Sequence, residues 1–119
     1  MDYRLFVVDG RVEGCIERRA MAGEWRANAS RGARVIPFVP GRRMREIAIE
    51  AARALDLDVA GVDLALGDEG PTVLEVNGRP SFRALFKATD KDMARPIAKA
   101  AMRRARTNRQ VRRDRTASA

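Results

Sequence analysis

The feature that most constrains the fold is a pair of segments, residues 59–66 (VAGVDLAL) and 72–77 (TVLEVN), separated by the sequence GDEGP. In both segments apolar residues alternate with other residues at a period of two, which is typical of strands with one buried face. A connection of five residues that contains glycine favours an antiparallel hairpin between such strands. The sequence therefore predicts that these two strands pair with each other.

The position of the turn fixes which residues of this hairpin face each other. A turn centred on Glu69 places Asp63 opposite Glu75 and Gly61 opposite Asn77. One face of the hairpin then carries two carboxylates and an amide beside small residues. The other face is apolar and consists of Val62, Leu64, Leu66, Leu74 and Val76.

Two carboxylates on opposed positions of a hairpin repel each other unless a positive charge lies between them. Carboxylate and amide oxygens suit Mg²⁺ or Mn²⁺, whereas zinc sites use His and Cys, and the chain has no His. The pattern of Asp63, Glu75 and Asn77 therefore predicts a site for a hard divalent cation. The alternative is a solvated polar face whose charge is neutralised by an Arg from elsewhere in the chain.

The N-terminal half predicts a second hairpin, an edge strand and a helix. Residues 3–8 and 11–18 flank Asp9-Gly10, a pair that suits a type I′ turn because both of its central positions need a positive φ. The polar stretch from Arg19 to Ala33 has no periodicity and is typical of a long loop. Residues 34–40 contain two prolines, which favours an edge strand. Apolar residues at helical spacing predict an amphipathic helix over residues 42–56.

The C-terminal part predicts one more helix and a tail. Thr89 and Asp92 have the spacing of a capping box, so we expect a helix to begin near Thr89 and to run towards Arg106, with a kink or restart at Pro96. After Thr107 we expect disorder. Taken together, the pattern predicts an α+β fold in which helices cover an antiparallel sheet.

Composition limits the chain to one small domain of 119 residues that contains four Phe, one Trp and one Tyr. The formal charge of +8 is concentrated in residues 99–115, which hold eight basic residues and one acid. The single Cys15, the absence of a leader peptide and the lack of a long apolar run predict a cytoplasmic protein without a membrane span.

The ordered set of motifs resembles the C-terminal part of the ATP-grasp ligases of the RimK family. The resemblance extends from about Asp2 to Lys99 and includes IERRA, GEWRANASRGA, REIAIEAARAL, LDLDVAGVDLAL and GPTVLEVNGRPSF. It implies the C-terminal lobe of the ATP-grasp fold and the cofactors ATP and Mg²⁺ or Mn²⁺, with two metal ions. It also implies a reaction in which a carboxylate becomes an acyl phosphate and is joined to an amino acid such as glutamate.

The resemblance implies a role for each candidate site residue. Asp63, Glu75 and Asn77 match the metal ligands of the family, and Arg4 matches an arginine that contacts the nucleotide phosphates. The loop segment matches the part that closes over the acceptor and the acyl phosphate, through Arg18, Arg19, Arg26, Asn28, Arg31 and Gly32. Of these, Arg4, Arg19 and Arg31 are the candidate catalytic residues, and Arg18 and Asn28 join Arg4 and Asn77 as candidate nucleotide-binding residues. The alternative is that these polar side chains are ordinary solvated surface.

Two departures from the family pattern shape the expected activity. An adenine-binding lobe precedes this segment in the family, so we expect this chain to bind ATP weakly, to be inactive alone, and to need a second chain or a homo-oligomer. The sequence GRPSF stands where the family has two small residues, Pro and Gly, which leaves the amino-acid and carboxylate substrates undefined. We divide the chain into a partial ATP-grasp domain (1–106) and a basic tail (107–119). The alternative function is a non-catalytic fragment whose tail binds nucleic acid or an acidic partner.

Overall fold

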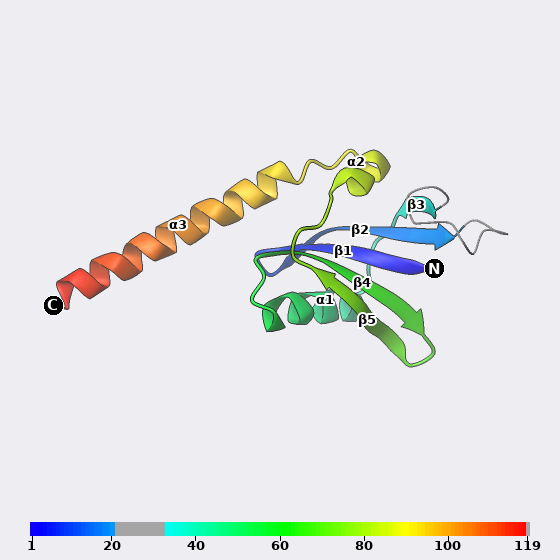
Figure 1. Cartoon of the computed structure of the whole chain (residues 1–119), viewed down its shortest axis with the longest axis horizontal. Coiled ribbons are helices and arrows are strands. Elements are labelled where there is room, and N and C mark those ends of the chain that lie inside the picture. The colour runs from blue at the N-terminus through cyan, green and yellow to red at the C-terminus, as the bar shows by residue number, and fades with distance from the viewer. Residues whose placement is uncertain (21–32, 119) are drawn as a thin grey trace.

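The computed structural model of the chain describes residues 1–20 and 33–118. Its centre is a five-stranded sheet with the strand order β3-β2-β1-β4-β5, in which every neighbouring pair is antiparallel (Figure 1). The elements are β1 (Asp2–Val8), β2 (Arg11–Ala20), β3 (Ala33–Pro37), α1 (Arg42–Ala54), β4 (Val59–Gly67), β5 (Gly70–Asn77), α2 (Arg83–Thr89) and α3 (Ala94–Ala117). The predicted α+β class with an antiparallel sheet is confirmed.

The N-terminal hairpin forms as predicted, because its turn residues adopt the backbone conformation that the turn requires. Asp9 has a φ of 50° and Gly10 a φ of 74°, so both central positions are left-handed. The strand with two nearby prolines, β3, lies at one edge of the sheet, where a missing backbone N–H leaves no gap in a ladder. The amphipathic helix α1 is also confirmed, with Met44, Ala48 and Ala52 buried.

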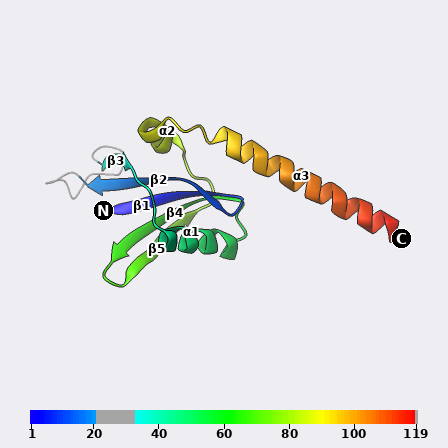
Figure 2. The same ribbon diagram turned by 180° about the vertical axis from the view of Figure 1, so that it is seen from behind.

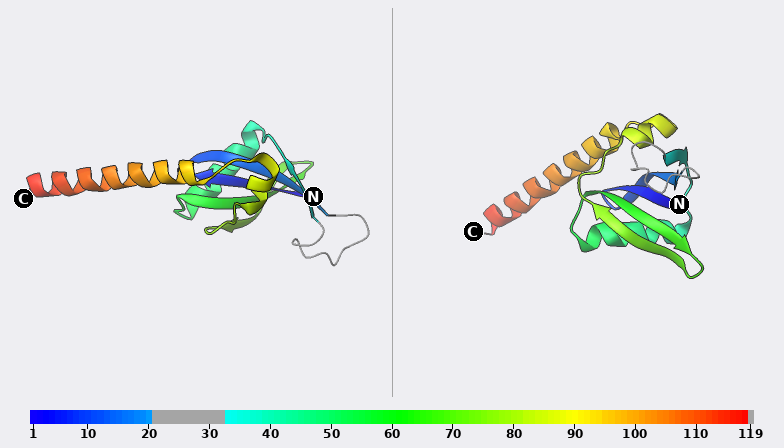
Figure 3. Two further views of the ribbon diagram at one scale, coloured as in Figure 1. Left: turned by 90° about the horizontal axis from the view of Figure 1, so that it is seen from above. Right: turned by 45° about the vertical axis from the view of Figure 1, so that its right-hand side comes forward.

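The sheet separates two apolar clusters. The helix α1 lies on one side of the sheet, and α2 lies on the other (Figures 1 and 3). Residues of β1 alternate between the two clusters, so that Leu5 and Val7 face α1 while Phe6 and Val8 face α2 and the start of α3. The first cluster adds residues of β4 and α1, and the second adds Ile16, Leu85 and Met93. Because β1 is covered on both faces, it is the most deeply buried strand, and its neighbours β2 and β4 are fixed by it.

The β4–β5 hairpin confirms the predicted pairing at one end and corrects it at the other. Asp63 pairs with Glu75 and Gly61 with Asn77, as expected. The turn itself is shorter than predicted, because Gly70 has a φ of 106° and pairs directly with Gly67. This tighter turn shifts the pairing of residues 64–67 by one position from the prediction. A bulge between Asp63 and Leu64 restores the predicted register for residues 61–63.

The bulge also corrects the predicted apolar face of this hairpin. Leu64 pairs with Val73, so Leu74 has no partner in the ladder, and its side chain is 58% exposed. Leu66, near the turn, is 47% exposed. Val62, Leu64 and Val76 do belong to the cluster under α1, as predicted.

The C-terminal helices differ from the prediction. Thr89 ends α2, a helix that the sequence did not predict, and Asp90 follows it with a left-handed φ of 57°. The long helix α3 begins only at Ala94, whose N–H donates to the Asp92 carboxylate at 2.9 Å. Pro96 therefore lies in the first turn, where its missing N–H has no helical partner to lose, and α3 continues past it.

The basic tail, expected to be disordered, continues α3 as far as Ala117. Two ion pairs join this helix to the sheet: Arg103 lies 2.7 Å from Asp9, and Arg104 lies 2.8 Å from Asp58. Beyond these pairs α3 extends away from the sheet (Figures 1 and 2). The helix α3 crosses residue 106 without a break, so no element boundary marks the predicted domain boundary there. That boundary stays a prediction.

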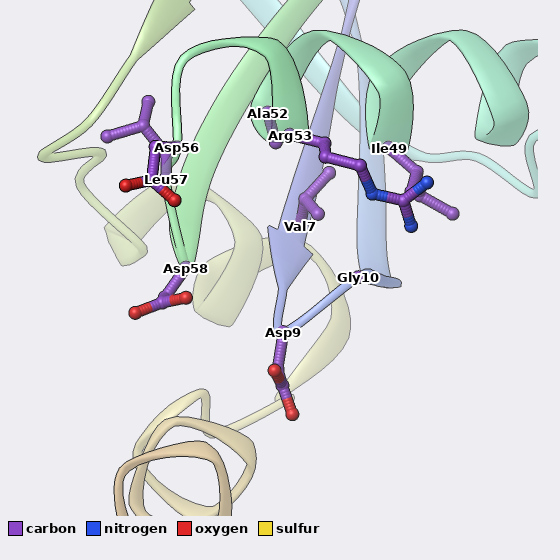
Figure 4. Close-up of a pocket in the computed structure, with 9 residues that line it drawn as sticks. All are labelled: Val7, Asp9, Gly10, Ile49, Ala52, Arg53, Asp56, Leu57 and Asp58. Carbon is purple, nitrogen blue, oxygen red and sulfur yellow. The ribbon is translucent and has the colours of Figure 1, made fainter. Parts of the chain in front are cut away.

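A hollow of about 250 Å³ lies beside these two ion pairs, at the end of α1 (Figure 4). Three acids line it, Asp9, Asp56 and Asp58, together with Arg53. Two of the three acids are engaged by α3, so we assign this hollow to the attachment of α3. No helix in residues 1–20 and 33–118 is long and apolar enough to span a bilayer.

The contact between α2 and the sheet provides a test of the fold. A Cβ atom built at Gly14 would lie 2.8 and 2.9 Å from the two terminal methyl carbons of Leu85, whose side chain is fully buried. We expect Gly14→Ala to lower the free energy of unfolding by about 1–3 kcal/mol, because the added methyl group overpacks this contact. Urea denaturation followed by circular dichroism measures the change.

Gly67→Ala is the control for this substitution, because Gly67 is exposed in β4 and its nearest neighbour atom lies 3.9 Å from the added Cβ. We expect its effect to stay within about 0.5 kcal/mol. Equal effects of the two substitutions would show that the α2 contact with Gly14 is not as tight as described.

Candidate functional site

One face of the sheet, the face that carries α2, brings together Arg4, Arg18 and Asp63, which the sequence singled out, and adds Asp2, which it did not. Asp2 and Arg4 are two apart on β1 and therefore share this face with Phe6. Arg4 is the cross-strand partner of Asp63 on β4, and Asp2 is the partner of Arg18 on β2. Two acids and two arginines from three adjacent strands thus meet next to the apolar cluster.

Asp63 is the centre of this group and is almost fully buried, with 4% of its surface exposed. Arg4 binds it in a bidentate way, with Nε 2.7 Å from Oδ1 and Nη2 2.9 Å from Oδ2. Arg18 donates to Oδ2 of Asp63 at 3.0 Å and to both oxygens of Asp2 at 2.9 and 2.6 Å. The four groups form a continuous chain of charge-assisted hydrogen bonds.

The charges of this network are held in their ionised forms. Burial would raise the pKa of Asp63, but the hydrogen bonds and charges of Arg4 and then Arg18 outweigh it, so the pKa lies below its ordinary value. The hydrogen bond to Asp2 raises the pKa of Arg18 above that of a free guanidinium, despite partial burial. Asp63 is therefore a carboxylate throughout the physiological pH range.

The two other predicted metal ligands lie beside Asp63 but are not joined to it. Glu75 is exposed, and within the described residues it makes no ion pair. Asn77 accepts a hydrogen bond from the backbone N–H of Arg79 at 2.8 Å. The structure thus places the three oxygen-bearing side chains on neighbouring positions of one hairpin, while both Asp63 oxygens are bound by arginine.

These residues fit a hard cation in their chemistry, since they offer two carboxylates and an amide oxygen on one sheet face. In the described residues no group of three or more His, Cys, Asp or Glu is arranged to hold a metal ion, and Asn77 is needed to complete a set of three. The positive charge next to Asp63 is arginine in this structure, which is the alternative that the sequence left open.

Arg19 is not part of this network. Because successive residues of a strand alternate, Arg19 lies on the opposite face of β2 from Arg18, and it donates a hydrogen bond to Glu17. Glu17 is buried there and pairs with Tyr3 of the cluster under α1. Four further candidates lie outside the described residues: Arg26, Asn28, Arg31 and Gly32.

The structure adds two cations that sequence reasoning did not select. A hollow of about 670 Å³ lies beside Arg4 and Arg18, and its opposite wall is α2, which contributes Arg83 and Lys87. Their spacing of four residues could have indicated one helix face. The signal was missed because α2 itself was not predicted.

Cys15 takes no part in this chemistry. Its thiol is buried in the sheet, and burial, followed by the charge of Glu17, raises its pKa to about 12. Since the thiolate is the nucleophilic form, this cysteine is a core residue.

Known proteins resemble this chain in sequence and in fold. The model of the RimK-like ATP-grasp domain matches residues 1–101. The chain belongs to this family. The RimK-like chain is 44% identical over 93 residues to the ribosomal protein bS6–L-glutamate ligase of Escherichia fergusonii, and the match covers 78% of the chain and 31% of that protein. It is 43% identical over 95 residues to a probable alpha-L-glutamate ligase of Parasynechococcus marenigrum, of which it covers 20%.

Solved structures confirm the ATP-grasp fold of the RimK-like chain. The ATP-grasp ligase PsnB, in complex with a phosphomimetic variant of its minimal precursor, Mg and ADP, superimposes with a TM-score of 0.69 at 22% identity over 85% of this chain and 32% of PsnB. D-alanine–D-alanine ligase from Bacillus anthracis gives a TM-score of 0.68 at 20% identity over 90% of this chain and 41% of that enzyme. The RimK-like chain therefore spans less than half the length of these ligases.

The Asp63 network makes stability depend on pH. The pKa of Asp63 is lower in the folded state than in the unfolded chain, where it is about 3.9. Its stabilising contribution is therefore complete above about pH 4 and is lost as the pH falls through the folded-state value. We expect Asp63→Asn to lower the free energy of unfolding at pH 7 by about 2–3 kcal/mol. This loss is smaller than the loss for a fully buried ion pair, because both arginines are partly exposed and solvent screens their charge.

Urea denaturation at pH 7, 5 and 3 measures this effect. The difference between the original chain and Asp63→Asn should narrow below about pH 4, because Asp63 takes up a proton in the unfolded chain there, whereas in the folded chain it does so only at lower pH. Glu50→Gln, at an exposed position of α1, is the control and should show no such difference. A gap that persists unchanged at pH 3 would contradict the ionic origin of the effect.

Proposed function

We propose that this chain is the metal- and phosphate-binding lobe of an ATP-dependent ligase that joins a carboxylate to an amino acid such as glutamate. The observation that carries the proposal is that Asp63 is the cross-strand partner of Glu75 and is itself bound by Arg4 and Arg18 on one sheet face. Support comes from relatives named as glutamate ligases and from the Mg and ADP bound by PsnB.

In this proposal Asp63, Glu75 and Asn77 hold Mg²⁺ or Mn²⁺, with two ions in the complete site. When bound, such ions neutralise the phosphate oxygens of ATP and the charge that develops during transfer. Arg4 and Arg18, which are the counter-ions of Asp63 in this structure, then become available to phosphate oxygens. Arginine is suited to both roles because its fork binds carboxylate and phosphate alike.

The proposed reaction has two steps. A carboxylate oxygen attacks the γ-phosphorus of ATP, the bond to the bridging β–γ oxygen breaks, and an acyl phosphate and ADP result. The amine of the incoming amino acid then attacks the acyl carbon, the carbon–oxygen bond to phosphate breaks, and the amine loses a proton as the amide forms. The residues of this chain position the reactants and neutralise charge, which is consistent with a site that has no His.

The remaining candidates are assigned on family resemblance alone. We propose that Arg31 and Arg19 assist the transfer together with Arg4, and that Asn28 contributes to nucleotide binding. Because the matches cover 31% and 20% of the first two relatives, we propose that turnover needs further parts of such ligases in addition to the residues described here.

Binding of Mn²⁺ tests the metal site. We expect Glu75→Gln to weaken Mn²⁺ binding in the presence of ADP by at least about tenfold, because it removes one anionic ligand. Glu75 is exposed, so this change should leave stability unaltered. Isothermal titration calorimetry or the electron paramagnetic resonance signal of free Mn²⁺ provides the measurement, with Glu50→Gln as the control.

Equal affinity for Mn²⁺ in the original chain, Glu75→Gln and Glu50→Gln would contradict the proposed metal site. A parallel measurement on Asn77→Ala separates the contribution of the amide from that of the carboxylates. We expect a smaller loss of Mn²⁺ affinity for Asn77→Ala than for Glu75→Gln, because an uncharged ligand is removed.

A second candidate function rests on the exposed basic half of α3. Residues 105–117 are exposed and extend beyond the sheet (Figure 2). This half carries Arg106, Arg109, Arg112, Arg113 and Arg115 against one acid, Asp114. An isolated basic helix of this kind suits nucleic acid or an acidic partner through charge complementarity.

Salt dependence tests this second function. Replacement of Arg109, Arg112 and Arg113 by Gln should reduce the slope of log affinity against log salt for RNA or DNA by about three, because each residue contributes about one phosphate contact. Fluorescence anisotropy with a labelled oligonucleotide measures the slope, and Arg45→Gln on α1 is the control. An unchanged slope would exclude α3 as the binding surface.

A further inference from the structure

The hollow between the sheet and α2 has a wall of cations and an apolar floor. The cations are Arg4 and Arg18 from the strands and Arg83 and Lys87 from α2. The described residues of the floor are Phe6, Ile16, Val35, Ala84 and Ala88, with Ser81 at the side. Its volume, about 670 Å³, is within the range of small-molecule sites.

The charges in this hollow are unequally compensated. Arg4 and Arg18 are paired with Asp63 and Asp2, so two carboxylates offset two guanidiniums. Within residues 1–20 and 33–118, Arg83 and Lys87 take part in no ion pair. The α2 wall therefore contributes two positive charges that the described residues do not balance.

The positions of these two cations are unfavourable for α2 on its own. Arg83 and Lys87 are four residues apart, so like charges are neighbours on the helix surface. Arg83 is also the first residue of α2, where the helix dipole disfavours a positive charge, and the first turn contains no acid. Leu85, between them in the sequence, is fully buried against Gly14 and fixes α2 on the sheet.

An anion in the hollow would relieve both unfavourable interactions, and the apolar floor indicates which kind. A phosphate chain has no apolar part, whereas a carboxylate on an aliphatic stem can place its carbons on Val35, Ala84 and Ala88, which are partly exposed, and its oxygens on the cations. Arg83 offers the planar fork that binds a carboxylate with two hydrogen bonds.

We propose that Arg83 and Lys87 form a subsite for an aliphatic carboxylate of the organic substrate, next to the metal and phosphate site. The proposal rests on the proposed function, because the hollow shares Arg4 and Arg18 with that site. The carboxylate has two sources, the incoming amino acid or an acidic peptide acceptor. In either case Arg83 and Lys87 determine substrate specificity without contacting the reacting phosphate.

The test uses the full chain without metal or nucleotide and follows backbone amide signals of residues 81–89 by nuclear magnetic resonance. The probes are L-glutamate, N-acetyl-diglutamate amide and inorganic triphosphate. We expect one of the two carboxylate probes to shift these signals, and the probe that does so identifies the source. Arg83→Gln combined with Lys87→Gln should weaken its binding by about tenfold or more, since two hydrogen bonds to charged groups are lost.

A matched control is Arg45→Gln combined with Arg53→Gln, which removes the same charge from exposed positions of α1 on the opposite face of the sheet. This control variant should bind the carboxylate probe with an affinity within about twofold of that of the original chain. Equal losses in both double variants, or binding of triphosphate alone at residues 81–89, would overturn the carboxylate subsite.

The outcome of the carboxylate-binding test is separable from the outcome of the Mn²⁺-binding test of the proposed function. Carboxylate binding that depends on Arg83 and Lys87, combined with no Mn²⁺ binding at Glu75, would leave the subsite in place and contradict the ligase site. Mn²⁺ binding that depends on Glu75, combined with no shift from either carboxylate probe, would leave the ligase site and overturn the subsite. Circular dichroism of each variant confirms that it is folded.

Discussion

The structure depends on one buried carboxylate at the centre of the sheet. Asp63 lies at a position that is nearly closed to solvent, and an unpaired charge there would cost several kcal/mol. Arg4 reaches it from the neighbouring strand, and Arg18 reaches it from the strand beyond. These contacts tie β1, β2 and β4 together next to the apolar cluster under α2. In the proposed ligase this same carboxylate is a metal ligand.

The same geometry suggests how binding and structure are coupled. In the proposed ligase a cation and a polyphosphate would together replace the ion pairs of Asp63. The cation would neutralise Asp63, and the polyphosphate would neutralise the arginines that Asp63 releases. Neither would bind as well alone, because one side of the Arg4–Asp63 pair would then be left without a counter-charge. A site of this kind favours the nucleotide–metal complex over either component, and it does so without a histidine or a cysteine.

Both hairpins could be predicted from the sequence, because local turn chemistry and the alternation of residues decide them. Asp9-Gly10 defines one hairpin, and the alternation around Asp63 and Glu75 defines the register of the other. The family resemblance itself is confirmed by the family match, and the site assignments that it added stay predictions. Of the features that were not predicted, only α2 depends on tertiary context, because Leu85 packs on Gly14. The other two are local: Gly70 shortened a turn and exposed Leu74, and α3 continued past Thr107 through an exposed stretch. The Arg partners of Asp63 were foreseen only as an alternative, since no local pattern identifies contacts between distant residues.

The most direct test of the central claim is paramagnetic broadening by Mn²⁺ in the presence of ADP, observed residue by residue in the full chain. The account predicts that broadening centres on residues 61–63 and 75–77, including the side-chain amide of Asn77, and that the Nε–H signal of Arg4 moves as its bond to Asp63 is exchanged. Broadening centred instead on Asp9, Asp56 and Asp58 at the end of α1, or spread evenly over the surface acids, would contradict it.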